Sequence, residues 1–439
     1  KNDEEAKQII DIALGLEGLR RQDGIHAAAI VISPDTITKF LPIQQKGSNA
    51  EIVTQYEMHT VEQLGLLKMD FLGLRNLSIV DRTLELIGSE SLDIDNLKLD
   101  DEKTFKLFAE GKMTGVFQLE SRVAQSTSRS LKPKRFEDIV ALVALIRPGP
   151  LGAGMHNEFA DRANNRKEIE YLHNDLESIL NETYGVILYQ EQVMQIAEKI
   201  AGFNLQEADN LRVAMGKKIP KVMEEQRKKF TDGAVSNNYS EQFAIELFDQ
   251  IAYFAGYGFN KSHSVPYALL AYQTAYLKAN YPAEYIAACL TAVKRDKDRT
   301  AIFLSEARDM GVKVSTPDVN LSSSDFTVND NEILFGLSAV RNVGDITADK
   351  IVLERESNGD FESIEDFLSR IDSRSLNKRG VEALIQGGGL DKFGHTRKGM
   401  FDSAIELIEN AKELKANKEN NQGSLFEMED SNSTHININ

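Results

Sequence analysis

The stretch KMDFLGLR, from Lys68 to Arg75, divides the chain into two kinds of sequence. Residues two apart in a strand share a face, so Lys68 and Asp70 are expected to point together at the end of a short strand. The opposite face of this strand is expected to be buried and consists of Leu67, Met69 and Phe71. An acid beside a base on one strand face is typical of a metal-ion and phosphate site, and a structural ion pair is the alternative.

Before this stretch the sequence predicts a mixed α and β region. Residues 5–20 predict a short helix, and residues 28–33 predict a buried strand that ends at Pro34. The segments TKFLPIQQ (38–45) and EIVTQYEM (51–58) predict further strands, and residues 66–71 predict the next one. The region before Gly73 is therefore expected to contain a small sheet.

After Gly73 the pattern becomes helical as far as about residue 290. Apolar residues at helical spacing predict a first helix that ends at Gly88; they are Leu77, Val80, Leu84 and Ile87. A second helix is expected over residues 186–201, with Tyr189, Val193, Ile196 and Ile200 on one face. Ser264 is predicted to cap a further helix that carries Pro266 in its first turn.

The last part of the chain mixes several patterns. The polar triplet at 329–331 predicts a hairpin turn between two short strands. Residues 336–394 predict two helix pairs interrupted by glycines, and the charged, Asn-rich tail from about residue 413 is expected to be flexible.

Composition limits the classes of function. The chain has 439 residues, a net charge of −17 and 41% hydrophobic residues, which fits about two to four globular domains without a membrane span. The single cysteine, Cys289, excludes a disulfide framework and fits a reducing cytoplasm. The acidic balance argues against indiscriminate binding of nucleic acid. The basic clusters at 121–147 and 212–229 allow a local groove for a phosphate backbone, or they are solvated helix faces.

Several further runs, taken in order with the first stretch, resemble one family. They are GVFQLES (115–121), FEDIVALVALIRPGP (136–150), YGVILYQEQVMQIA (184–197), AMGKK (214–218), FAGYGFNKSHS (254–264) and YALLAYQTAYLKANYPAEY (267–285). The chain resembles the bacterial DNA polymerase III alpha subunits, the family C replicative polymerases. The resemblance implies an α+β fold that is mostly α: the C-terminal part of a polymerase-beta-like palm sheet, then a large helical fingers domain and helix-hairpin-helix units.

The resemblance also implies domain limits. Residues 1–76 would be the end of the palm, with the end of the thumb at the N-terminus, and residues 77–290 the fingers. Residues 291–335 would form a connector with short strands, residues 336–412 the helix-hairpin-helix region, and residues 413–439 a flexible tail. The chain opens without an initiator Met, which we interpret as an internal start in a longer protein.

In this family the aspartate of K-x-D-F-L-G-L-R is the last of three that hold two Mg²⁺ ions, which implies that Asp70 is a catalytic metal ligand. The family supplies the other two from an upstream D-x-D strand. The nearest match in this chain, Asp93-Ile94-Asp95, follows Asp70 in a loop and fits turn and helix-cap chemistry better. We therefore expect that these residues alone do not synthesise DNA.

The resemblance assigns phosphate and nucleotide contacts to basic and polar residues, which are Lys68, Arg75, Arg147, Arg212, Lys217, Lys218, Asn260, Lys261 and His263. The polar residues before the helix of Pro266 would add an anion site at a helix N-terminus; a capped helix with a solvated lysine is the alternative. Val213 stands where the family usually has a second basic residue, which leaves the triphosphate geometry open. His26, in a family-like turn before the first strand, is either near the substrate or a buried core histidine.

Two motifs suggest macromolecular partners. The turn at Arg341, Val343 and Gly344 fits a helix-hairpin-helix contact with DNA phosphates, and an ordinary helical hairpin is the alternative. Gln422, Leu425 and Phe426 form a Q-x-x-L-F peptide of the kind that the bacterial sliding clamp (beta subunit) accepts.

The resemblance thus implies part of a DNA-directed DNA polymerase that uses Mg²⁺, dNTPs and primer-template DNA in the cytoplasm, together with the sliding clamp and other replicase subunits. A non-catalytic module that binds DNA and the clamp is the second interpretation.

Overall fold

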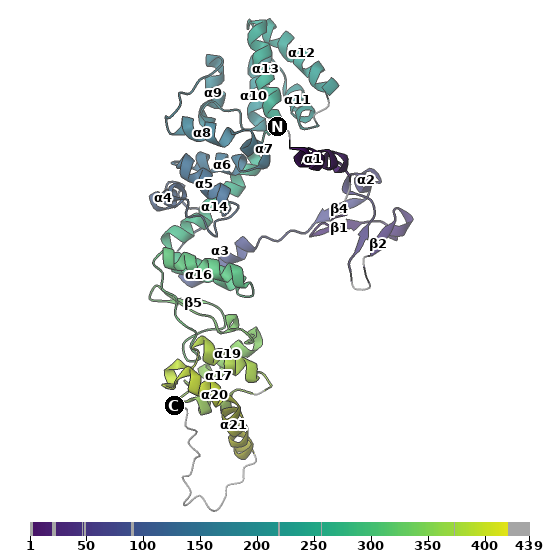
Figure 1. The fold of residues 1–439 in the computed structure, drawn as a ribbon. Helices are drawn as coiled ribbons and strands as arrows, with labels where there is room; N and C mark the ends of the chain where they lie inside the picture. Colours follow the sequence, from purple (N-terminus) through teal and green to yellow (C-terminus); the bar gives the residue numbers. More distant parts are fainter. Residues whose placement is uncertain are drawn as a thin grey trace, which may run out of the picture. The chain divides into compact units, whose positions relative to one another are not determined.

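The computed structural model describes residues 3–19, 23–45, 47, 50–88, 92–217, 220–255, 257–372 and 374–419. The chain divides into two compact units, Lys1–Leu74 and Arg75–Asn439, and Figure 1 labels many of their helices and strands. We call them the strand unit and the helical unit and describe each by itself. The predicted class, mostly helical with a few short strands, is confirmed.

The described residues of the strand unit form two antiparallel strand pairs and two helices. Strand β1 (Ala29–Ile32) pairs with β4 (Leu67–Asp70), and β2 (Ile43–Gln45) pairs with β3 (Ile52–Thr54). Helix α1 covers Glu4–Leu16, the 3-10 turn η1 covers Ile37–Lys39, and α2 covers Met58–Gln63. The buried core of this unit is small and is formed by Leu41, Val61 and Leu66.

The predicted burial of the strand faces is wrong. Strand β1 alternates between half-buried and exposed residues. The register places Ile30 opposite Met69 and Ile32 opposite Leu67, so apolar residues of both strands share one face. Leu67 is 55% exposed and Met69 is 39% exposed. A two-stranded ribbon needs a second layer to cover a face, and none of the described residues of the strand unit covers this one.

The helical unit begins with a long run of helices. Their bounds are α3 Arg75–Ile87, α4 Glu102–Glu110, α5 Arg122–Leu131, α6 Phe136–Leu145, α7 Pro148–Gly152, α8 Met155–Ala163, α9 Glu177–Leu180, α10 Gln190–Ala201, α11 Leu205–Lys217, α12 Pro220–Ser236, α13 Glu241–Ala255, α14 Lys261–Asn280, α15 Pro282–Val293 and α16 Lys297–Asp309, with 3-10 turns η2 Asn174–Leu176 and η3 Asn181–Thr183. Helix α14 packs against α4, α6 and α15. Its buried side, which includes Ala268, Ala271 and Tyr272, therefore lies within a continuous core.

Two predicted helix starts differ from the structure. Helix α10 begins at Gln190, four residues later than predicted, although its predicted apolar face is buried. Helix α14 is capped by Asn260, whose side chain accepts the N–H of His263 at 2.9 Å. The predicted cap, Ser264, is buried inside the helix and donates to the carbonyl of Val140 at 2.7 Å. Asn is as good a cap as Ser, so the earlier residue begins the helix and Pro266 lies in the second turn.

The predicted hairpin is confirmed. Strand β5 (Thr327–Asn329) pairs with β6 (Glu332–Leu334), and the two turn residues between them, Asp330 and Asn331, have φ values of 48° and 63°. Left-handed conformations at both positions are what a two-residue hairpin turn requires, and Asn and Asp tolerate them. Helix α16 was not predicted, because the region around it was taken as a connector.

The last part of the helical unit contains the predicted glycine-punctuated segments. Their bounds are η4 Leu337–Ala339, α17 Asp345–Asn358, α18 Ile364–Arg370, α19 Lys378–Gly387, η5 Asp391–Phe393, α20 Arg397–Asp402 and α21 Ala404–Glu419. In each predicted helix pair one member is only a 3-10 turn, η4 or η5. Helix α21 extends to Glu419, so the first residues of the expected tail, 413–419, are helical. Its remaining residues, 420–439, lie outside the described part of the chain.

Two lysines connect segments of the helical unit. The Lys278 side chain is 1% exposed and contacts Glu306 Oε1 at 2.6 Å and the carbonyls of Lys112 and Thr114 at 2.7 and 2.8 Å. Lys294 donates to Asp325, Ser338 and Asp345 at 2.6, 3.0 and 2.5 Å. In the part of the chain that the structure describes, no helix is long and apolar enough to cross a membrane.

Candidate functional site

The predicted acid and base lie together on β4. Lys68 Nζ is 2.7 Å from Asp70 Oδ1 and 2.9 Å from Oδ2, so they share one strand face as expected. The Asp70 side chain is 39% exposed and that of Lys68 is 17% exposed. The hydrogen bond from Lys68 holds the pKa of Asp70 below its usual value, and a charge on His26 adds to this effect. The carboxylate is therefore ionised and already faces a cation.

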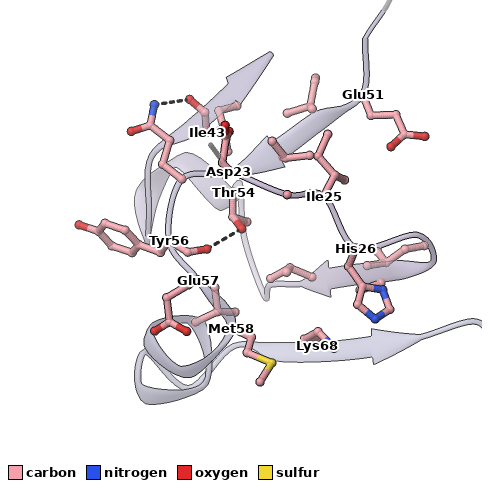
Figure 2. A pocket seen from close by; sticks show the side chains of 18 of the residues that line it. Asp23, Ile25, His26, Ile43, Glu51, Thr54, Tyr56, Glu57, Met58 and Lys68 are labelled. Atoms are coloured by element: carbon pink, nitrogen blue, oxygen red, sulfur yellow. Dashed lines mark hydrogen bonds between the residues drawn. The ribbon is translucent and has the colours of Figure 1, made fainter. Parts of the chain in front are cut away.

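His26 lies next to this pair because β1 and β4 are neighbours. The Phe71 N–H donates to the Ala28 carbonyl at 2.9 Å, and the Ala28 N–H donates to His26 Nδ1 at 3.2 Å. His26 is exposed, so the alternative of a buried core histidine is wrong. His26 and Lys68 both line a cavity of about 1160 Å³ in the strand unit, shown in Figure 2.

The described carboxylates are not gathered into a metal-binding group. Among the residues that the structure describes, no three His, Cys, Asp or Glu side chains are grouped so that they could hold a metal ion. Glu57, which lines the same cavity, caps α2 by accepting the N–H groups of His59 and Thr60 at 2.9 Å each. Asp93 similarly accepts the N–H of Asp95 within its loop, at 3.2 Å. Two further acids, Asp23 and Glu51, also line this cavity.

The N-terminus of α14 holds three predicted residues, and an internal carboxylate already occupies its N–H groups. Glu191 on α10 accepts the N–H of Lys261 at 2.9 Å and that of Ser262 at 3.3 Å. The Lys261 ammonium is 2.6 Å from Glu182 Oε2. His263 lies with its ring centre 4.4 Å from that of Tyr267. The sequence did not reveal Glu191 or Glu182 as partners, because only the tertiary fold brings α10 and η3 to this helix end.

Arg147 holds a neighbouring loop in place. Its Nη2 donates to the Tyr257 carbonyl at 2.6 Å, and its guanidinium lies 4.2 Å from the centre of the Phe259 ring. Burial lowers its pKa. Among the residues that the structure describes, no carboxylate lies within ion-pair distance of Arg147, in contrast to Lys261.

The remaining predicted phosphate residues lie on other elements. Arg212 on α11 is paired with Asp209, with Nε 2.8 Å from Oδ1. Lys217 is the last residue of α11, and Lys218 lies outside the described residues. Arg75 is exposed at the start of α3. It belongs to the helical unit, whereas Lys68 and Asp70 belong to the strand unit.

The three predicted DNA-contacting residues lie at the turn before α17. Arg341 is exposed, Val343 is 3% exposed in the core, and Gly344 is the N-cap. No described group accepts the N–H of Asp345 or Ile346. These two donors are therefore open to an anion. The predicted clamp peptide, Gln422, Leu425 and Phe426, lies outside the described residues.

Comparison with known proteins identifies three regions. Residues 1–73 match the family described as the bacterial DNA polymerase III alpha NTPase domain, and residues 76–238 match the bacterial DNA polymerase III alpha subunit finger domain. Residues 311–400 match a helix-hairpin-helix motif. This last match begins 25 residues before the region predicted from the sequence.

Individual relatives cover nearly the whole chain. The DNA polymerase III subunit alpha of Thermus aquaticus is 47% identical over 90% of this chain and 33% of its own length. Those of Mycobacterium tuberculosis (strain CDC 1551 / Oshkosh) and Buchnera aphidicola are 42% and 44% identical over 95% and 97% of this chain, and 36% and 38% of their own lengths. The chain therefore spans about a third of the length of these relatives.

Proposed function

The chain belongs to the family of bacterial DNA polymerase III alpha subunits, and on that premise we propose that it is the part of a replicative polymerase that joins the end of the palm, the fingers and the start of the clamp-binding region. The complete protein would add dNMP units to a primer 3′ end under the direction of a template strand and release pyrophosphate. The observation that carries this proposal is the ionised Asp70 carboxylate, whose two oxygens both face a cation, the Lys68 ammonium.

Asp70 would supply one ligand of the catalytic metal site. Two Mg²⁺ ions neutralise charge on the attacking and leaving oxygens of phosphoryl transfer. The described residues contain no group of three side chains that could hold a metal ion, so the remaining ligands would come from elsewhere in the complete protein. Lys68 would then be released from Asp70 and could face a phosphate.

The exposed apolar face of β1 and β4 supports the proposal that this chain contains only part of the palm. Ile30, Ile32, Leu67 and Met69 share this face, and each is more than a third exposed. Contiguous exposed apolar side chains mark surfaces that a further layer covers. We infer that another segment of the complete protein packs there and so builds up the sheet around Asp70.

In the fingers, phosphate binding would compete with the protein's own carboxylates. Lys261 and Arg212 are each held by an acid, so a bound triphosphate would exchange for Glu182 or Asp209. Arg147 has no such competitor in the described part of the chain, although its guanidinium is engaged with the Tyr257 carbonyl. Lys217, Lys218, Asn260 and His263 complete the set of contacts that we propose for the incoming nucleotide and the template.

The turn at Gly344 would bind the DNA backbone. The N–H groups of Asp345 and Ile346 are open to an anion, and Arg341 adds an exposed positive charge. Contacts of this kind hold a duplex without reading its sequence. Leu425 and Phe426 would bind the sliding clamp, in the bacterial cytoplasm and in company with other replicase subunits.

One observation favours the second function, a module that binds DNA and the clamp without catalysis. The described residues lack a complete group of metal-binding carboxylates. Primer extension by the 439-residue chain alone, with Mg²⁺ and dNTPs, is accordingly expected to give no product. Extension at a normal rate would contradict this expectation.

The test of the proposed function is Asp70→Asn in the complete protein. The measurement is primer extension on gapped DNA with Mg²⁺, and we expect a rate reduced about a thousandfold or more, because one ligand of the charge-stabilising ions is lost. The control is Asp35→Asn, since Asp35 is also an exposed acid of the strand unit that pairs with a lysine, Lys39. Equal rates for the two variants would refute the metal-binding role of Asp70.

A further inference from the structure

A small cavity lies between α5 and α8 in the helical unit, away from the residues considered so far. Its volume is about 250 Å³. The residues that line it are Arg122, Val123, Ser126, Thr127, Ser130, His156 and Asn157. Six of these seven side chains are polar or charged, which distinguishes this cavity from an apolar packing defect.

The charge of the cavity is positive. Arg122 is its charged lining residue, and none of the seven is acidic. In the part of the chain that the structure describes, no carboxylate lies within ion-pair distance of Arg122. The nearby acids Glu158 and Asp161 are paired with other cations, Glu158 with Arg162 and Lys167 and Asp161 with Arg166. A negatively charged ligand would therefore meet attraction without a competing acid in the lining.

Two polar side chains of the cavity lack partners. Thr127 is only 4% exposed, and its hydroxyl makes no hydrogen bond to any residue that the structure describes. His156 Nδ1 is inaccessible to solvent and likewise has no hydrogen-bond partner there. Buried polar groups without partners destabilise a protein. Of the two, the Thr127 hydroxyl is the one accessible from the cavity, so an oxygen of a bound anion would accept its hydrogen bond.

The first turn of α8, whose His156 and Asn157 line the cavity, adds backbone donors. Helix α8 has nine residues and begins after Gly154, an N-cap in the left-handed region (φ 72°) that provides no side-chain cap. Among the described residues, no group accepts the N–H of Met155 or His156. Free N–H groups and the positive end of the helix dipole favour an anion at a helix N-terminus.

We propose that this cavity binds a phosphoryl oxyanion through Arg122, the hydroxyls of Ser126 and Thr127, and the first turn of α8. The ligand is either a phosphodiester of a DNA strand or a free phosphate, because both present the same tetrahedral set of acceptor oxygens. The site does not rest on the polymerase reaction, since it contains none of the residues assigned to that reaction.

Titration of the 439-residue chain with inorganic phosphate, followed by calorimetry, tests the site. Arg122→Gln is expected to weaken phosphate binding about tenfold, because a charge-assisted hydrogen bond is lost, and Thr127→Val about threefold, because a neutral hydrogen bond is weaker. The matched control is Arg129→Gln, the same change of charge on the same helix at a residue outside the cavity. Circular dichroism establishes that each variant is folded.

A second experiment distinguishes a DNA phosphodiester from a free phosphate as the ligand. Binding of a single-stranded oligonucleotide is measured over a range of salt concentrations. If a DNA phosphodiester occupies the site, Arg122→Gln lowers the slope of log affinity against log salt by about 0.7, and Arg129→Gln does not. If only inorganic phosphate binding weakens, the ligand is a free phosphate. Equal phosphate affinity in the wild type, Arg122→Gln and Arg129→Gln would overturn the proposal.

Discussion

The strand unit and the helical unit differ in how completely they bury their own apolar residues. Among its described residues the strand unit has three buried core residues, and the apolar side chains of α1, including Ile9 and Leu14, are more than half exposed. The helical unit has large clusters in which residues such as Phe159 and Leu142 are fully buried. The helical unit is therefore stabilised by its own packing, whereas the strand unit, which holds Asp70, exposes the kind of surface that a further layer covers.

The largest effect that would test this comparison is expected from Phe159→Ala. Phe159 is fully buried and contacts the Tyr184 ring edge to face, so its loss should lower the free energy of unfolding of the helical unit by about 3–5 kcal/mol. Urea unfolding followed by circular dichroism measures this change. The exposed residue Leu205 is the control, and Leu205→Ala is expected to change stability by less than about 0.5 kcal/mol. Similar costs for both would mean that the helical unit is not tightly packed.

A second prediction concerns the buried pair of Lys278 and Glu306. Lys278→Met leaves the Glu306 carboxylate without its cation in a largely buried position, and is expected to cost about 3 kcal/mol in urea unfolding. The double variant Lys278→Met with Glu306→Gln removes the unpaired charge. It should be more stable than the single variant. A double variant that is no more stable would show that the two side chains are not coupled.

A third prediction is a loss of stability of the helical unit in alkali. The Tyr184 hydroxyl donates to Asp138 at 2.8 Å, and burial together with this carboxylate raises the pKa of Tyr184 from its ordinary value of 10.0 to about 12. The folded state therefore favours the protonated phenol, so this contribution is complete below pH 10 and is lost as the pH rises towards 12.

The measurement is the melting temperature between pH 9 and pH 12. Tyr184→Phe should show a smaller decrease over this range than the wild type, because it has no phenol to ionise at this position. Some decrease remains, since the pKa of Tyr239 is also raised to about 12, by its hydrogen bond to Asp175 and by burial. Identical decreases in both proteins would contradict the assignment to Tyr184.

The smallest effect is expected on the exposed face of β4. Leu67→Thr with Met69→Thr should change the stability of the 439-residue chain by less than about 0.5 kcal/mol, because both side chains are more than a third exposed. In the complete protein we expect a cost of about 2 kcal/mol or more, since the proposed covering layer would bury them. Equal, small costs in both proteins would show that nothing covers this face.

The helical periodicity of the sequence was a reliable guide to the helical unit. The face of α10 that carries Val193 and Ile196 is buried as predicted, and the Asp330–Asn331 turn has the backbone conformation that a hairpin requires. These features depend on residues close in sequence. The strand faces were mispredicted because alternation indicates which residues share a face, but not whether another layer covers that face.

In the candidate site, too, the contact between residues close in sequence was predicted and the contacts between distant residues were not. The Lys68–Asp70 pair follows from the two-residue repeat of a strand and was predicted, although its role as a metal ligand rests on family resemblance. The Glu191 carboxylate at the N-terminus of α14 was not predicted, because it lies 70 residues away in sequence from Lys261. The same holds for the cavity between α5 and α8, whose lining comes from two separate helices.

Lys294 joins the end of α15 to three other segments of the helical unit. It follows the last residue of α15, and its ammonium holds Asp345 at the first residue of α17 as well as Asp325 and Ser338. An ammonium has three hydrogens, so these three partners use its whole capacity. Arg295, the next residue, also pairs with Asp345, so two neighbouring cations at the end of α15 hold the first residue of α17.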